Sequence, residues 1–143
     1  MKVFINPGHA PNGKPDPGAV NAKTGLRESD VAAAVGNAAA QYLISAGVAA
    51  TVLQHDDLAT VCDTANASGA DLFISIHCNA ADSAAALGTE TYCYPGSMAG
   101  QELANAVQRQ IVDSLHTVDR GVKLAIPGQN GLYVLNNTSM PAI

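Results

Sequence analysis

A nearly continuous apolar run decides the fold class, and it reads Asp71-Leu72-Phe73-Ile74-Ser75-Ile76-His77. β-Branched and aromatic residues dominate this run, which is typical of a strand buried on both faces. Shorter segments with strand character lie at 2–6, 48–54 and 88–94. Strands buried on both faces belong to parallel sheets, so the run at 71–77 predicts a mostly parallel sheet.

Segments with a helical spacing of small and apolar residues separate these strands. They cover residues 27–46, 57–68 and 97–115. Alternating strands and helices predict an α/β fold, in which residues 1–143 form a single domain. We expect a mostly parallel twisted sheet flanked by helices on both faces. After the third helix we expect a loop over 117–131 and a short extended segment at 132–135.

The composition is that of a globular protein, since 48% of the 143 residues are hydrophobic and 13% are charged. The formal net charge is −5, and the seven Lys and Arg residues are spread along the chain. We therefore expect no nucleic-acid partner. No apolar run is long enough to cross a bilayer, so no membrane partner is expected either. The cysteines Cys62, Cys78 and Cys93 are expected to be small buried hydrophobes.

Three polar residues are placed to meet at one edge of the predicted sheet. His9 follows the first strand, His77 closes the third, and Glu28 opens the first helix. Open α/β sheets bind ligands outside the carboxyl ends of their strands, so these side chains can converge there. Two imidazoles and a carboxylate match a catalytic zinc site that keeps its fourth position open.

Glu28 shares a helical face with Val31 and Val35, and we expect that face to be buried, with Tyr42 continuing the stripe. A carboxylate on a buried face needs a partner, which favours the metal site. Simpler interpretations of the same residues stay open. A carboxylate in the first turn of a helix is also favoured by the helix dipole. A histidine at the end of a strand is commonly an ordinary surface or core residue. Spacing alone does not decide between these alternatives and a metal site.

A set of short motifs, in one order along nearly the whole chain, resembles the zinc-dependent N-acetylmuramoyl-L-alanine amidases. Each motif is weak by itself, but the ordered set is quite specific. The motifs are Asn6-Pro7-Gly8-His9, Asp16-Pro17-Gly18-Ala19, Glu28-Ser29-Asp30-Val31, Ala65-Asn66, Ser75-Ile76-His77-Cys78-Asn79-Ala80, Asp119-Arg120-Gly121-Val122-Lys123, and 132–142.

The resemblance implies that His9, Glu28 and His77 bind one zinc ion. It also implies hydrolysis of the amide between N-acetylmuramic acid and L-alanine, with peptidoglycan or a muropeptide as the substrate. Asn79 is a candidate for contact with that substrate. The place of action would be the bacterial cell wall. The absence of a signal peptide before Pro7 is what we expect of an excised domain or a phage-type lysin.

The same resemblance implies a catalytic glutamate a few residues after Met140-Pro141-Ala142, where the sequence ends at Ile143. We therefore expect no catalytic carboxylate within these 143 residues, and a catalytic domain without its last strand and tail. An alternative is a zinc-containing, muropeptide-binding pseudoenzyme or a truncated inactive form. Glu90 is the other obvious carboxylate, and we expect it to face solvent on its strand.

The first motif departs from the family at one position that matters for the metal. Asn6 stands where the family commonly has aspartate, and we expect its amide to hydrogen-bond His9. A neutral amide would raise the basicity of that ligand less than a carboxylate does.

Overall fold

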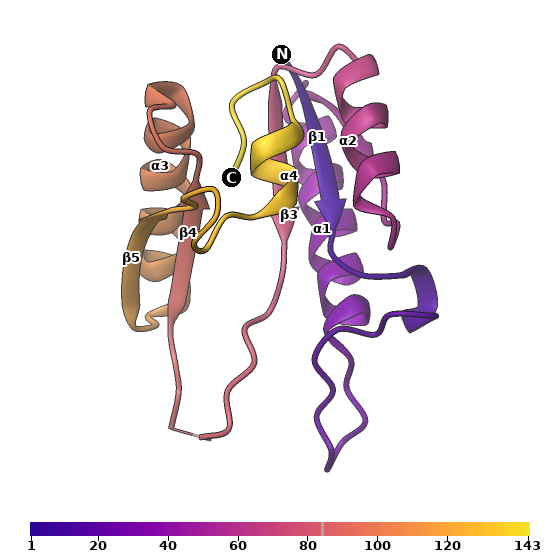
Figure 1. Cartoon of the computed structure of the whole chain (residues 1–143), viewed down its shortest axis with the longest axis vertical. Helices are drawn as coiled ribbons and strands as arrows, with labels where there is room; N and C mark the ends of the chain where they lie inside the picture. Colours follow the sequence, from indigo (N-terminus) through magenta and orange to yellow (C-terminus); the bar gives the residue numbers. More distant parts are fainter. Residues whose placement is uncertain (84) are drawn as a thin grey trace. The chain divides into compact units, whose positions relative to one another are not determined.

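The structure is a computed structural model that describes residues 1–83 and 85–143. The chain forms two compact units, of which the first contains Met1–Ala80 with Thr138–Met140. The second contains Ala81–Asn137 with Pro141–Ile143. Parallel strands accompanied by helices make up both units, as Figure 1 shows. The α/β fold class predicted from the sequence is confirmed.

The first unit is built on a three-stranded parallel sheet. Its strands are β1 (Lys2–Pro7), β2 (Ala49–Val52) and β3 (Leu72–Ile76), in the order β2-β1-β3. Ile5 of the central strand pairs with Val52 on one side and Ile74 on the other. The three strands run in one direction, so their carboxyl ends meet at one edge of the sheet.

Helices cover both faces of this sheet. Val3 and Ile5 of β1 form a core cluster with Ala40 of α1 (Glu28–Ser45). Phe4 points to the opposite face, where its ring stacks on Phe73 at a centroid distance of 5.8 Å. Helix α2 (Leu58–Ala67) lies on that second face (Figure 1) and buries Val61, Cys62 and Ala65. The sheet is therefore a buried layer, as its nearly continuous apolar strands predicted.

The buried face of α1 differs from the predicted one. Val35 and Tyr42 are 48% and 79% exposed. Glu28 itself is buried, as predicted, but beyond the first turn the buried positions are those of the smallest side chains: Ala32, Gly36 and Ala40. A Cβ at Gly36 would come within 2.7 Å of Cγ of Pro7, so the helix approaches β1 too closely for larger residues. Steric fit, not apolar size, selects the face that α1 presents to the sheet.

The second unit pairs β4 (Thr89–Cys93) with β5 (Asp119–Leu124) in parallel, and α3 (Met98–Leu115) packs on both strands. The loop predicted over 117–131 is therefore wrong for the residues of β5. Four of the six β5 residues are charged or glycine, so the strand has little apolar signal. The extended segment predicted at 132–135 is also wrong, because Tyr133–Asn137 forms the short helix α4.

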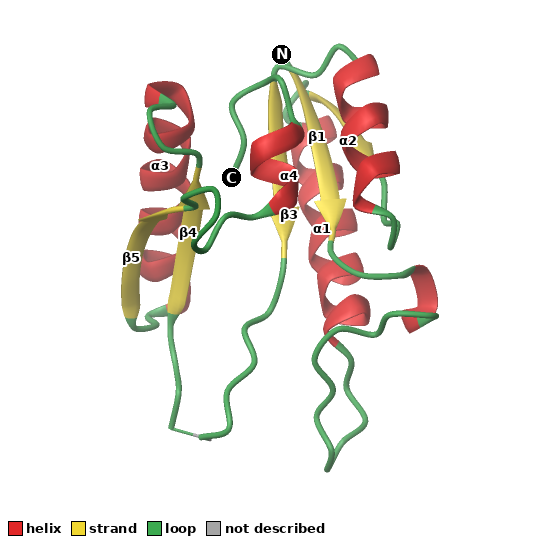
Figure 2. Ribbon diagram, viewed as in Figure 1, coloured by secondary structure: helices red, strands yellow, loops and turns green. Residues whose placement is uncertain are grey.

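A long loop joins β1 to α1 and surrounds the start of that helix. It includes the short 3-10 helix η1 (Pro11–Gly13), visible in Figure 2 as the red turn that follows β1. A turn at 21–25 folds the loop back, so that Val20 forms an antiparallel bridge with Arg27. Within the part of the chain that the structure describes, every helix is too short or too polar to cross a membrane.

Candidate metal centre

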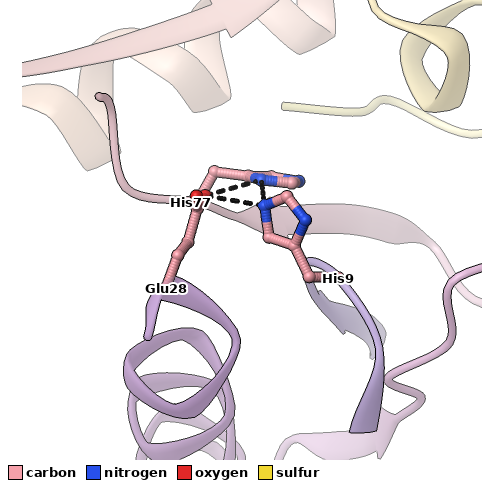
Figure 3. Close-up of side chains that lie close together, drawn as sticks. All are labelled: His9, Glu28 and His77. Carbon is pink, nitrogen blue, oxygen red and sulfur yellow. Dashed lines mark hydrogen bonds and ion pairs between the residues drawn. The ribbon is translucent and has the colours of Figure 1, made fainter. Parts of the chain in front are cut away.

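His9, Glu28 and His77 converge in the first unit, as Figure 3 shows. Glu28 Oε1 lies 3.0 Å from both His9 Nε2 and His77 Nδ1, and these two nitrogens are 3.2 Å apart. His9 lies two residues past β1, His77 directly follows β3, and Glu28 is the first residue of α1. The parallel strand ends thus bring together side chains that are far apart in the sequence.

The three facing atoms have the arrangement that a small cation needs. Two donors that are each ~2.1 Å from a tetrahedral ion are ~3.4 Å apart, close to the distances between these atoms. Together they supply two imidazole nitrogens and one carboxylate oxygen, and all three lie within 4.8 Å of one another. Imidazole with carboxylate suits zinc and several other divalent metals. This group could therefore hold a metal ion.

Backbone amides hold the Glu28 carboxylate in one orientation. Oε1 accepts a hydrogen bond from the Cys78 amide at 2.8 Å, and Oε2 accepts one from the Ala19 amide at 2.9 Å. The side chain is only 6% exposed. Burial favours the neutral acid, but the two amides and His9 outweigh it and hold the pKa of Glu28 below its usual value. The carboxylate is therefore anionic, with Oε1 aimed at the histidines.

Asp16 orients the His9 ring. Its Oδ2 lies 2.7 Å from His9 Nδ1, and its Oδ1 accepts a hydrogen bond from the Gly18 amide at 2.9 Å. Burial disfavours the charged imidazole, but Asp16 and Glu28 outweigh burial and raise the pKa of His9. Because Nδ1 faces Asp16, Nε2 is the ring nitrogen left to face Glu28 and His77.

The prediction that Asn6 orients His9 is wrong. The Asn6 amide donates to the carbonyl of Leu53 at 3.0 Å, and its oxygen accepts from the Ser75 hydroxyl at 3.0 Å. Asn6 of β1 is thus linked to the end of β3 and to the residue that follows β2. Sequence reasoning missed the role of Asp16, although Asp16-Pro17-Gly18-Ala19 was among the motifs that carried the resemblance.

Two glycines leave room for the ligand side chains. A Cβ at Gly18 would lie 2.5 Å from Cδ2 of His9 and 2.7 Å from Oε2 of Glu28. A Cβ at Gly8 would lie 2.5 Å from Nε2 of His77. Gly18 also has φ +66°, a left-handed conformation that favours glycine. The loop backbone is therefore pressed against the three side chains and limits where they can move.

Asn79 and Glu90, the two other candidate site residues, lie in different environments. Asn79 is exposed two residues past His77, and its contact with substrate stays a prediction. Glu90 does not face solvent as predicted: its side chain is 7% exposed and forms ion pairs with Arg120 and Lys123 in the second unit.

The three cysteines divide between two environments. Cys62 and Cys93 are buried, as predicted, and burial raises the pKa of each thiol. Cys78 is exposed, contrary to prediction. It directly follows His77, and its backbone amide donates to Glu28 Oε1.

Comparison with known proteins gives the family. The model of the family described as N-acetylmuramoyl-L-alanine amidase matches residues 3–143. This chain therefore belongs to the N-acetylmuramoyl-L-alanine amidase family. Among solved structures, a crystal structure of the N-acetylmuramoyl-L-alanine amidase from Clostridium difficile 630 has a TM-score of 0.85 and 31% identity. The match covers 99% of this chain and 75% of that one.

Curated relatives agree with this assignment. The uncharacterized protein YqiI of Bacillus subtilis (strain 168) is 38% identical, over 99% of this chain and 66% of its own length. The N-acetylmuramoyl-L-alanine amidase LytC of the same bacterium is 33% identical, over 99% of this chain and 28% of its own length. The chain thus spans between about a quarter and two thirds of these relatives. The named amidases do not favour the pseudoenzyme alternative.

Proposed function

We propose that residues 1–143 are the catalytic domain of a zinc-dependent hydrolase that cleaves the amide between N-acetylmuramic acid and L-alanine in peptidoglycan. The observation that carries this proposal is the convergence of His9 Nε2, Glu28 Oε1 and His77 Nδ1 in a chain of the amidase family. The place of action would be the bacterial cell wall, in the extracellular or periplasmic space.

One zinc ion would be held by His9, Glu28 and His77. Three protein ligands are the number that catalytic zinc sites use, because one position is left for water or substrate. Bound there, zinc would supply Lewis acidity towards water and towards the scissile carbonyl oxygen.

The residues of the chain have distinct parts in this proposal. Glu28 neutralises part of the charge of the cation through Oε1, while the Ala19 and Cys78 amides keep both of its oxygens in place. Asp16 accepts the Nδ1 proton of His9 and so directs Nε2 to the cation. His77 has a 48% exposed side chain, so the site is open to a substrate on the side of that ring.

Proton transfer needs a further carboxylate, which would take a proton from water and return one to the leaving amine. Glu28 is a proposed ligand, and the Asp16 carboxylate is hydrogen-bonded to His9 and Gly18. In the family that the chain resembles, we expect the catalytic glutamate a few residues after the segment that matches Met140-Pro141-Ala142. We propose that this glutamate, and not a residue of 1–143, transfers the proton.

Zinc analysis of the purified protein tests the metal part of the proposal. We expect one zinc per chain, removed by a strong chelator and restored by added zinc. The variant His9→Ala removes one of the three donors and should lose zinc during purification. A purified wild-type protein that neither contains nor takes up zinc would overturn the proposal.

Digestion of purified peptidoglycan tests the reaction. A form of the protein that continues past Ile143 should release new free amino groups from L-alanine, and chelation should stop the release. The form of residues 1–143 should be far slower. Equal rates for the two forms would overturn the assignment of the proton-transfer carboxylate, and no release by either form would overturn the activity.

A further inference from the structure

The side chain of Gln54 links the two backbone segments that carry His9 and Glu28. Its amide nitrogen Nε2 donates to the carbonyl of Gly8 at 3.0 Å and to the carbonyl of Ser29 at 2.9 Å. Gly8 directly precedes His9, and Ser29 directly follows Glu28. A primary amide has two N–H groups, and each of these is used on one ligand-bearing segment.

The same link extends to the third ligand through the backbone. The Gly8 amide donates to the carbonyl of Ile76 at 2.9 Å, and Ile76 directly precedes His77. A continuous path of hydrogen bonds thus runs from Ser29 through Gln54 and Gly8 to Ile76. Each bond in this path ends one residue away from a ligand.

We propose that Gln54 is a positioning residue that fixes the spacing of His9, Glu28 and His77 for the metal. This inference rests on the metal-binding function proposed above. Gln54 lies two residues past β2, in the chain segment that leaves the carboxyl end of the sheet. Among the described residues, Gln54 is the side chain that donates hydrogen bonds to both the Gly8 and the Ser29 carbonyl. Without the Gln54 amide, the direct link between the Gly8 and Ser29 carbonyls is lost. The remaining hydrogen bonds of the first turn of α1 run through the Glu28 carboxylate and through residues 17–19 of the loop.

A second glutamine in the chain makes the link testable. Gln108 of α3 is 3% exposed, and its amide nitrogen donates to the Thr89 carbonyl and to Asp119, while its oxygen accepts from Thr91. Gln108 therefore joins α3 to β4 and β5, and all three elements belong to the second unit. Loss of Gln108 should affect folding stability without touching the metal ligands.

The experiment compares Gln54→Met with Gln108→Met in the protein of residues 1–143. Methionine keeps the length of each side chain and removes its hydrogen-bonding groups. Zinc affinity is measured by competition with a chromophoric chelator, and the stability of each metal-free protein is measured by urea unfolding. Gln54→Met should weaken zinc binding by roughly 10- to 100-fold, the usual effect of losing a group that orients metal ligands. Gln108→Met should lower stability and leave zinc affinity unchanged.

A shorter amide provides a second test if Gln54→Met folds poorly. Gln54→Asn keeps both N–H groups on a side chain one methylene shorter, which reaches one carbonyl at most, so an intermediate loss of zinc affinity is expected. Wild-type zinc affinity in Gln54→Met, or an equal loss in Gln108→Met, would overturn the role of Gln54. A wild-type chain that binds no zinc would overturn the proposed function itself, and this inference with it.

Discussion

At the scale of the residue, two of the three proposed metal ligands, Glu28 and His9, are oriented through their second polar atom. The second oxygen of Glu28 accepts the Ala19 amide, and the second ring nitrogen of His9 meets Asp16. These bonds leave one atom of each side chain for the cation. Such outer contacts fix the direction of a ligand before a metal arrives, and so reduce the ordering that binding must accomplish.

Replacing Asp16 by asparagine tests this view of His9. The amide has nearly the shape of the carboxylate but lacks its charge, so it should hold the Nδ1 proton of His9 less firmly. We expect zinc affinity to fall by about 10- to 100-fold, measured by chelator competition. The exposed Asp113 of α3 provides the control, because Asp113→Asn removes the same charge in the second unit. Equal affinity in the two variants would contradict the role of Asp16.

Adding a methyl group at Gly18 tests the contact between the loop and the ligands. Gly18→Ala would place Cβ against His9 and Glu28, whereas Gly25→Ala adds one where nothing lies within 4 Å. Both glycines have positive φ, so both variants have a similar backbone strain of roughly 1–2 kcal/mol. Thermal unfolding should therefore detect both changes, while zinc binding should be lost only in Gly18→Ala. Undiminished binding in Gly18→Ala would show that the loop does not confine the ligands.

At the scale of the element, α1 carries Glu28 to the sheet because its inner face is made of very small residues. Gly36 lies against Pro7 of β1, and Ala32 is fully buried between Glu28 and that contact. Residues four apart share a helical face, so Glu28, Ala32 and Gly36 form one line along the helix. The close approach of helix and strand is thus what brings the carboxylate to the histidines.

A larger side chain at Gly36 should push α1 away from β1. Gly36→Val overfills this contact and should lower the free energy of unfolding by about 1–3 kcal/mol, measured with denaturant. Ala38→Val adds a similar branched side chain at an exposed position of the same helix and should change it by less than about 0.5 kcal/mol. Valine has a better helix propensity than glycine, so only the contact with Pro7 gives a reason for a loss in Gly36→Val. Undiminished stability of Gly36→Val would contradict the close approach.

The elements that the sequence predicted well are those with a strong apolar pattern. The run at 71–77 identified β3, and the parallel arrangement then placed His9 and His77 at one edge of the sheet. The face of α1 was mistaken because Val35 and Tyr42 have more apolar area than alanine or glycine. In a helix this rich in alanine, close approach decides which residues are inside, and that depends on the partner strand.

The parts of the site that the sequence did not predict depend on loop geometry. Gln54 and Asp16 lie in irregular segments. No helical or strand periodicity predicts there which way a side chain points. Asn6 illustrates the converse, since its nearness to His9 in sequence suggested a bond that the strand geometry does not allow. Asn6 is hydrogen-bonded to Leu53 and Ser75, whereas His9 lies past the end of β1 with a left-handed backbone (φ +66°).

At the scale of the whole molecule, all three proposed ligands belong to one compact unit. They come from the end of β1, the start of α1 and the end of β3, so a cation would join three elements that the chain connects through long segments. Any species that binds the folded state alone stabilises it by mass action. Metal binding should therefore appear as a gain in folding stability.

Zinc at about 100 times its dissociation constant should raise the free energy of unfolding by about 2.7 kcal/mol, measured by urea titration with and without the metal. Glu28→Gln keeps the shape of the ligand and removes its charge, so this variant should gain much less. A gain of equal size in Glu28→Gln would place the stabilising zinc elsewhere on the chain.

The coordination of zinc in the purified protein is the most direct test of the central claim. X-ray absorption at the zinc edge reports the number and type of ligand atoms around the ion. We predict one zinc per chain with two imidazole nitrogens at ~2.0–2.1 Å, the remaining ligands being oxygen. The spectrum of His77→Ala should lose one imidazole. Sulfur from Cys78 in the first shell, or a spectrum unchanged in His77→Ala, would contradict the account.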